Sequence, residues 1–278
     1  MLWGPQKGMT RYQSNISAAG GAIGTSCTAG ASEATKGTIV EAIASTDFDS
    51  YLMHITCAEN SLAYTVGRGC VDILIGAAGS EQVLIGNLLM GYCGGIIEVQ
   101  CKGPKQWMFS VYVPAGTRIS IRSAGERTST AVRVAISLMG GLGSPQFQVG
   151  TKVITYGVGT VANGTSITEG GSGAEGSWTQ ITSSTTHEHF CLVPSYQFNG
   201  GSGSTEKFSY VDIGIGAASS EVQIGQRYVY SSGYYYPMDG PLNPMPTFCN
   251  IPSGTRLAMR ASNSSGARSA QGAIHGVV

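Results

Sequence analysis

The stretch VDILIGAAGSE at residues 71–81 occurs again, with two substitutions, as VDIGIGAASSE at residues 211–221. Each copy begins with apolar side chains at every second position, which is typical of a half-buried β-strand. The Gly-Ala-Ala that follows is typical of a tight bend or of close sheet packing. Each copy also approaches a dinucleotide-binding glycine motif, but each lacks one of its glycines and no amphipathic helix follows. We therefore predict a structural role for the repeated stretch.

Further pairs of similar stretches follow the same order along the chain. VPAGTRISIRSA at 113–124 matches IPSGTRLAMRAS at 251–262, and KGTIVEAIAST at 36–46 more weakly matches EGSWTQITSST at 175–185. ISLMGG near residue 140 and AIHGVV at the end form a fourth, weaker pair. The first three pairs are separated by 140, 138 and 139 residues. Constant order and nearly constant spacing indicate the tandem duplication of a whole domain, since solenoid repeats are much shorter.

The duplication predicts the domain organisation of the chain. The first 23 residues have no counterpart, and we expect residues 1–23 to be an N-terminal arm that becomes ordered only on a partner. The first repeat is predicted at residues 24–141 and the second at residues 158–278. Residues 142–157 between them are predicted to be a linker, whose TKVITY sequence favours an additional edge strand.

Composition and alternation both favour an all-β fold. The chain has 41 glycines, and only 12% of its residues are charged, about half the usual share of roughly 25%. WMFSVYV at 107–113 and AVRVAISL at 131–138 alternate apolar and other side chains, and Pro-Ala-Gly and Gly-Gly turns separate such runs. We predict a tandem duplication of an antiparallel β-sandwich domain that is jelly-roll-like.

The repeated strands each carry one Asp that points away from the apolar face. Each repeat also carries two Arg residues, four positions apart, in the strand that contains P-x-G-T-R. A bidentate Arg–carboxylate pair would fix the register of two neighbouring strands. The alternative is that these Arg side chains lie on the surface and contact another subunit. The candidate structural ion pairs are Asp72 with Arg118 or Arg122, and Asp212 with Arg256 or Arg260.

The sequence contains no recognisable catalytic or metal-binding constellation. His187 and His189 share one face of an extended segment, but no third or fourth ligand is visible. The chain has no G-x-S-x-G motif, and no His-containing constellation occurs in both repeats. Its seven cysteines include no CxxC pair, which favours buried thiols. We predict a protein that is not an enzyme and that has no metal site and no cofactor.

Charge and hydropathy argue against two further classes of partner. The net charge is zero, so nothing attracts a polyanion, and we expect no nucleic-acid partner. No apolar run is long enough to span a bilayer, and the first 15 residues contain no apolar signal region, so we expect no membrane association.

The most individual stretch is RYVYSSGYYYPMDGPLNPMPTF at residues 227–248, where the first repeat has only one Tyr. Tyrosines on loops stiffened by proline make good contact surfaces for proteins or for sugar rings. The alternative is that they pack on their own sheet. The residues of this candidate interaction surface are Tyr228, Tyr230, Tyr234, Tyr235 and Tyr236.

Taken together, KGTIVEAIAST, VDILIGAAGSEQVLIGNLL, VPAGTRISIRS and AVRVAISLMGG resemble a family of uncharacterised virion proteins of tailed bacteriophages. The resemblance is clear over residues 36–141 and weaker over the second repeat. It implies a non-enzymatic particle component with β-sandwich-like domains, and it brings no catalytic residues. The first 23 residues and the Tyr-rich stretch depart from the family.

The resemblance and the composition lead to the same functional expectation. We expect a structural component on the exterior of a tailed phage particle, made in the host cytoplasm and located in the virion. Tail or tail-fibre attachment is slightly favoured over capsid decoration. Its partners would be other virion proteins and copies of itself, with a trimer favoured, held by multivalent contacts. The alternative is an adhesin module that binds a receptor or a host-surface glycan through the Tyr-rich stretch.

Overall fold

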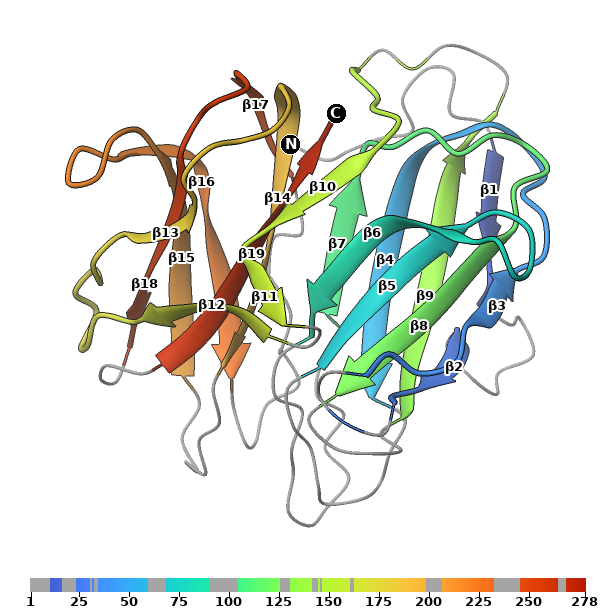
Figure 1. Cartoon of the computed structure of the whole chain (residues 1–278), viewed down its shortest axis with the longest axis horizontal. Helices are drawn as coiled ribbons and strands as arrows, with labels where there is room; N and C mark the ends of the chain where they lie inside the picture. The colour runs from blue at the N-terminus through green and yellow to red at the C-terminus, as the bar shows by residue number, and fades with distance from the viewer. Residues whose placement is uncertain are drawn as a thin grey trace.

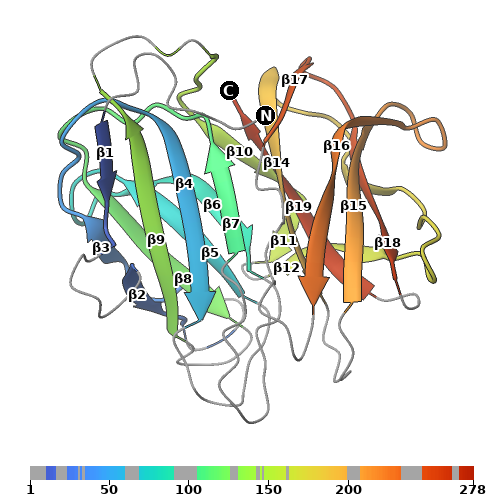
Figure 2. The same cartoon turned by 180° about the vertical axis from the view of Figure 1, so that it is seen from behind.

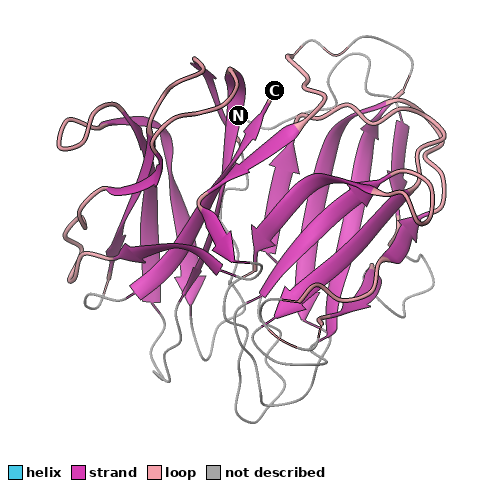
Figure 3. Cartoon of the chain, viewed as in Figure 1, coloured by secondary structure: helices cyan, strands magenta, loops and turns pink. Residues whose placement is uncertain are grey.

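Two antiparallel β-sheets face each other in each half of the chain in the computed structural model (Figure 1). The structure describes residues 11–16, 24–30, 32, 35–59, 69–90, 105–125, 131–141, 145, 147–160, 163–198, 207–232, 246–264 and 269–278. These residues form 19 strands and no helix (Figure 3). The predicted fold class is confirmed: the chain is all-β, with a sandwich of antiparallel sheets in each repeat.

The first sandwich contains a five-stranded sheet and a four-stranded sheet. The five-stranded sheet has the order β1-β9-β4-β7, and β2 also pairs with β9. The four-stranded sheet has the order β3-β8-β5-β6. The strands are β1 (Arg11–Ser14), β2 (Thr25–Thr28), β3 (Val40–Ile43), β4 (Ser50–Glu59), β5 (Gly69–Ile75), β6 (Gln82–Leu89), β7 (Lys105–Phe109), β8 (Ile119–Gly125) and β9 (Ala131–Gly140).

The second sandwich repeats this arrangement. Its six-stranded sheet has the order β11-β12-β19-β14-β17, with β10 also pairing with β19, and its four-stranded sheet has the order β13-β18-β15-β16. The strands are β10 (Val153–Tyr156), β11 (Val158–Thr160), β12 (Asn163–Thr168), β13 (Thr179–Thr182), β14 (His189–Phe198), β15 (Lys207–Ile215), β16 (Val222–Ser232), β17 (Thr247–Ile251), β18 (Leu257–Asn263) and β19 (Ser269–Val277).

Both repeats have a strand that the sequence comparison left outside them. β1, from the predicted arm, pairs antiparallel with β9, the last strand of the first repeat. β10, from the predicted linker, pairs in the same way with β19, the last strand of the second repeat. The expectation that the arm becomes ordered only on a partner is therefore wrong for Arg11–Ser14, which are ordered within the chain itself.

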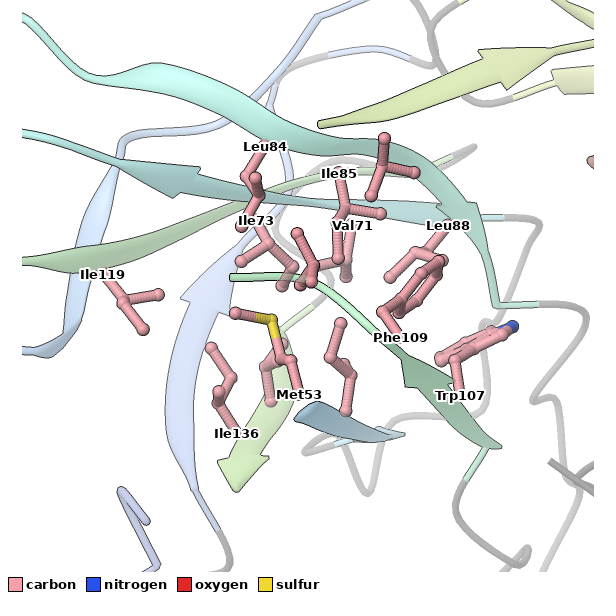
Figure 4. Packing of buried hydrophobic residues seen from close by; sticks show 14 of the residues in the cluster. Met53, Val71, Ile73, Leu84, Ile85, Leu88, Trp107, Phe109, Ile119 and Ile136 are labelled. Atoms are coloured by element: carbon pink, nitrogen blue, oxygen red, sulfur yellow. The ribbon is translucent and has the colours of Figure 1, made fainter. Parts of the chain in front are cut away.

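Alternation along the strands sets the core of the first sandwich. Val71 and Ile73 on β5 point between the sheets, where they lie near Met53 and Ile136 of the opposite sheet (Figure 4). The intervening Asp72 therefore points to the outer face of its own sheet. The same alternation in the second copy buries Val211 and Ile213 in the second core.

The core of the first sandwich continues into the second sandwich. β6 lies against β10, β14 and β19 (Figure 2), whereas the equivalent strand β16 lies against β17 of its own sandwich. Across this contact the Thr155 hydroxyl donates a hydrogen bond to the Gly86 carbonyl oxygen, at 2.9 Å. The residues of the second sandwich that belong to the first hydrophobic core are Val153, Phe190, Cys191, Val193 and Val277.

Candidate functional site

The repeated Asp of the first sandwich pairs with one of its two candidate Arg residues. Asp72 on β5 lies opposite Arg122 on β8, and Arg122 Nε is 2.8 Å from Asp72 Oδ2. Arg118 does not contact this Asp in the described ion pairs; it binds Glu41 and Glu81 instead, each at 2.7 Å. The pair of Asp72 with Arg122 connects two neighbouring strands, and only 2% of the Asp72 side chain is exposed.

Three further side chains complete this Asp72 site. Lys36 Nζ is 2.8 Å from Asp72 Oδ1 and 2.7 Å from Asn87 Oδ1. The backbone N–H of Asn87 also donates to Asp72 Oδ1, at 2.8 Å. Asn87 has a φ of 52°, a left-handed conformation in which Asn is enriched among non-glycine residues. Cys70 contributes its thiol, 3.1 Å from Lys36 Nζ and 3.4 Å from Asn87 Oδ1.

The second repeat builds a related site around Asp212. Arg260 Nε lies 3.1 Å from Asp212 Oδ2, as the sequence predicted for one of its two candidates. Arg227, which the sequence did not single out, binds both Asp212 oxygens at 2.9 and 2.8 Å. Arg227 also forms an ion pair with Glu175. Asp212 is fully buried beneath these groups.

The two sites differ in charge at two aligned positions. Lys36 and Glu175 are aligned by the pair KGTIVEAIAST and EGSWTQITSST, and continuing the first pair of stretches aligns Asn87 with Arg227. In both repeats these two side chains contact each other beside the buried Asp. A cation faces a neutral amide in one repeat, and an anion faces a cation in the other. The opposite charges at 36 and 175 were the signal in the sequence that could have identified these positions.

Two aromatic rings enclose the Arg residues of the second site. The guanidinium carbon of Arg260 lies 4.5 Å from the centre of the Trp178 ring, and that of Arg227 lies 6.0 Å from the centre of the Tyr210 ring. A Cβ atom at Gly214 would come within 2.7 Å of Trp178. This explains one of the two differences between the repeated stretches, because the first copy has Leu74 at this position and no Trp to accommodate.

The other predicted Arg of each repeat, Arg118 or Arg256, pairs with a Glu of its own repeat. Arg256 binds Glu221 at 2.7 Å, as Arg118 binds Glu81. Hydrogen bonds from its own backbone N–H and from Arg118 lower the pKa of Glu81. Desolvation alone would raise the pKa of Glu221, but hydrogen bonds from its own backbone N–H and from Arg256 lower it overall. Both carboxylates therefore favour their charged form in the folded chain.

The predicted interaction surface of tyrosines is partly wrong. Tyr228 and Tyr230 are each only 2% exposed and belong to the core of the second sandwich. The Tyr228 hydroxyl lies 2.8 Å from Thr247 Oγ1, and the Tyr230 hydroxyl donates to the Pro194 carbonyl oxygen at 3.2 Å. Burial raises the pKa of both phenols. The other three candidates, Tyr234, Tyr235 and Tyr236, lie outside the described residues.

A Ser–His contact lies between β14 and β19 of the second sandwich, beside residues of the first. His275 Nε2 is 2.9 Å from Ser195 Oγ, and its Nδ1 is 3.0 Å from Thr155 Oγ1. Since the Thr155 hydroxyl donates its proton to Gly86, Nδ1 of His275 is the donor to Thr155 and Nε2 accepts from Ser195. Both Ser195 and His275 are completely buried, so no substrate reaches this pair, and burial lowers the pKa of His275 to about 3. The contact ties strands together and is not a nucleophile with its base.

No protein-family model and no curated protein matches the chain. Among solved structures it is similar to PNGF-II, with 11% identity and a TM-score of 0.37 over 96% of this chain and 65% of that chain. It is also similar to tripeptidyl peptidase 2, with 8% identity and a TM-score of 0.27 over 98% of this chain and 24% of that chain. It is similar as well to the VLP of the human norovirus GI.7 Houston strain, with 8% identity and a TM-score of 0.25 over 93% of this chain and 68% of that chain. These likenesses are too weak to carry an argument about function.

The described part of the chain contains no metal-binding cluster and no membrane-spanning helix. No group of three or more His, Cys, Asp or Glu side chains lies close enough there to hold a metal ion. None of the described residues belongs to a helix that is long and apolar enough to cross a membrane. The five cysteines that the structure describes are thiols. The candidate sites that the two repeats share are those built around Asp72 and Asp212.

Proposed function

We propose that the protein is a non-enzymatic structural component on the exterior of a tailed phage particle. Attachment at the tail or tail fibre is slightly favoured over capsid decoration, and binding rests on multivalent contacts with other virion proteins and with copies of the chain. The observation that carries this proposal is the hydrophobic core that the two sandwiches share. A shared core fixes the two domains relative to each other, as a spacer between binding partners requires.

The use of the charged groups supports the same proposal. The buried carboxylates Asp72 and Asp212 are matched by cations of their own repeat, and Glu81 and Glu221 are matched in the same way. Bidentate or networked Arg–carboxylate contacts of this kind hold strand register. These groups stabilise a scaffold and are already engaged within the fold.

Several apolar side chains are exposed at the surface of the described part of the chain. Tyr12 on β1 is 62% exposed, Val222 at the start of β16 is 64% exposed, and Phe248 on the edge strand β17 is 45% exposed. A surface with little net charge opposes association only weakly. Many weak contacts of this type, repeated over many copies, give strong attachment through effective concentration.

The proposal is tested on the particle itself. Antibodies against the purified full-length chain would be used to label purified particles of the phage that encodes it, and the copy number would be measured by quantitative mass spectrometry. A dozen or fewer copies at one end would support tail attachment, and hundreds over the shell would support capsid decoration. Absence of the chain from purified particles would contradict the proposal.

The glycan-binding alternative has a separate readout on the same preparation. Binding of the chain to a glycan array that disappears when Tyr234, Tyr235 and Tyr236 are changed to Ala would favour the adhesin. The matched control is Tyr12→Ala, a tyrosine of the other sandwich that lies outside the Tyr-rich stretch.

A further inference from the structure

The Asp72 site brings together the three groups that amide exchange requires: a primary amine, a carboxamide and a carboxyl group. Lys36 Nζ lies 2.7 Å from Asn87 Oδ1 and 2.8 Å from Asp72 Oδ1. We propose that Lys36 and Asn87 become joined by an isopeptide bond within the folded chain, with Asp72 as the acid–base catalyst. This inference is independent of the proposed function.

The first requirement is proximity of the amine to the amide. An amine that already forms a hydrogen bond to the oxygen of an amide is within a small movement of the carbon of the same amide. Reacting groups held at such separations gain the large effective concentrations of intramolecular reactions. The folded sheet supplies this proximity, because Lys36 precedes β3 and Asn87 lies on β6, 51 residues further along the chain.

The second requirement is a group that moves protons. Asp72 is within hydrogen-bond distance of the reacting amine, Lys36 Nζ, and it also accepts from the backbone N–H of Asn87, which holds this residue beside it. Its side chain is only 2% exposed, and that of Lys36 is 15% exposed. A positioned carboxyl group at such distances is suited to general acid–base catalysis.

The reaction balances without any further reagent. Asp72 takes one proton from the Lys36 ammonium group, and the neutral Nζ attacks Cγ of Asn87, which moves the carbonyl electron pair onto Oδ1. Asp72 returns its proton to Nδ2, the Cγ–Nδ2 bond breaks as the carbonyl re-forms, and ammonia leaves. Asp72 then takes the remaining extra proton from Nζ and passes it to the ammonia. The products are one secondary amide and one ammonium ion.

The third requirement is stabilisation of the negative charge that develops on Oδ1. The Cys70 thiol donates toward Asn87 Oδ1, with Sγ at 3.4 Å. Burial raises the pKa of this thiol, so that it keeps its proton and remains a donor. A donor directed at an oxygen where charge develops lowers the barrier to attack at the neighbouring carbon.

The second repeat provides an internal comparison. Its equivalent positions carry Glu175 and Arg227, which contact each other beside Asp212. A carboxylate and a guanidinium at these positions form an ion pair and cannot form this amide. The contact between the two positions is therefore common to both repeats, whereas the pair of side chains that can react occurs only in the first.

The bond is tested by the intact mass of the purified full-length chain under denaturing and reducing conditions. We expect a mass lower than that of the sequence by one ammonia molecule, and one proteolytic product that contains both Lys36 and Asn87. Lys36→Arg removes the nucleophile but keeps a cation beside Asp72, and it is expected to restore the full mass. Asn87→Asp is expected to lose water in place of ammonia.

One competing source of the same mass loss is controlled by the design. Succinimides at Asn-Gly sequences also lose ammonia, and the chain has two such sites, at Asn163 and Asn199. These sites are unaffected by Lys36→Arg, and they give no cross-linked peptide. A wild-type chain with the full sequence mass, or a mass loss that persists in Lys36→Arg without a cross-linked peptide, would overturn the proposal.

Discussion

The ring of Phe109 in the first sandwich meets the ring of His275 in the second edge-on, with centroids 6.0 Å apart and an interplanar angle of 83°. Phe109 lies on β7 and faces the first core, while His275 lies on β19 and is completely buried. Such an edge-to-face contact stabilises an aromatic pair by about 1 kcal/mol beyond its buried area. The contact therefore belongs to the joint between the sandwiches, and it links their stabilities.

The joint predicts that the two sandwiches unfold together. Trp107 is buried in the first core, and Trp178 packs on Gly214 in the second sandwich. In a Trp3→Phe background, we expect the Trp107→Phe and Trp178→Phe variants, each of which leaves one of these two reporters, to give coincident urea transitions by fluorescence, because cooperative units unfold as one. Two transitions separated by more than the effect of the substitutions would show that the sandwiches are independent.

His275 predicts a loss of stability in mild acid. Its pKa is lowered from 6.5 to about 3 in the folded chain, so the unfolded chain binds one more proton between these values. The contribution of His275 to the free energy of unfolding should therefore be fully present above about pH 6.5 and should decrease as the pH falls toward about 3, by at most about 1.4 kcal/mol per pH unit. His54 and His189, whose pKa values burial also lowers, add to the decrease. His275→Gln should reduce this slope in urea titrations, even if it lowers stability at neutral pH. An unchanged slope would contradict this assignment.

The lowered pKa values of Glu81 and Glu221 predict a second loss of stability, at lower pH. Their pKa values are lowered from 4.5, so their contribution is present above that value and is lost as the pH falls through the lower folded values. Glu81→Gln should flatten the pH dependence of the melting temperature below about pH 4.5 and leave it unchanged between about pH 4.5 and 6.5, where the effect of His275 begins. A change confined to the range above about pH 4.5 would refute the prediction.

We expect the Asp72→Ala substitution to cause a large loss of thermal stability. The substitution leaves the Arg122 and Lys36 cations without their buried partner, and removing one member of a buried pair costs about 3–5 kcal/mol. Since both cations keep partial access to water, we expect the lower part of this range, read as a fall in melting temperature by calorimetry. Asp47→Ala, at an exposed turn position of the same sandwich, is the control. An unchanged melting temperature in Asp72→Ala would contradict the ion-pair interpretation.

The difference in charge between the repeats predicts that substitutions at Glu175 and Arg227 have strongly coupled effects on stability. Glu175→Lys alone places a third cation beside Asp212, next to Arg227 and Arg260, and should destabilise the chain by about 1–2 kcal/mol. Adding Arg227→Asn recreates the arrangement of the first repeat and should recover most of this loss. A double-mutant cycle by chemical denaturation should give a coupling energy of about 0.5–3 kcal/mol. Additive effects would show that the two positions do not interact.

The sequence predicted the sandwich fold because period-two alternation determines which face of each strand is buried. It also limited each buried Asp to two Arg candidates, because both were predicted to lie in one strand and the choice depends on register. Register places Asp72 opposite Arg122 and Asp212 opposite Arg260. That choice required the paired strands, since a shift along the strand would have favoured the other Arg.

The other features could not be predicted from local patterns. Asn87 reaches Asp72 because β6 is irregular there, and an irregular strand has no period that a sequence displays. Tyr228 and Tyr230 align with Leu88 and Met90, which are buried in the first sandwich. The alignment with apolar residues was therefore a better guide to the burial of Tyr228 and Tyr230 than the aromatic composition of the stretch, which had favoured an interaction surface.

The shared core also constrains how the chain folds as it is synthesised. Phe190, Val193 and Val277 complete the hydrophobic core of a sandwich whose own strands end at Gly140. A ribosome therefore releases the first repeat well before the residues that cover its apolar edge have been made. During that interval the nascent domain exposes apolar surface, and such intermediates aggregate readily. The shared core makes the two domains rigid relative to each other. Until β19 has been synthesised and has packed, the nascent chain therefore depends on rapid elongation or on a chaperone to avoid aggregation.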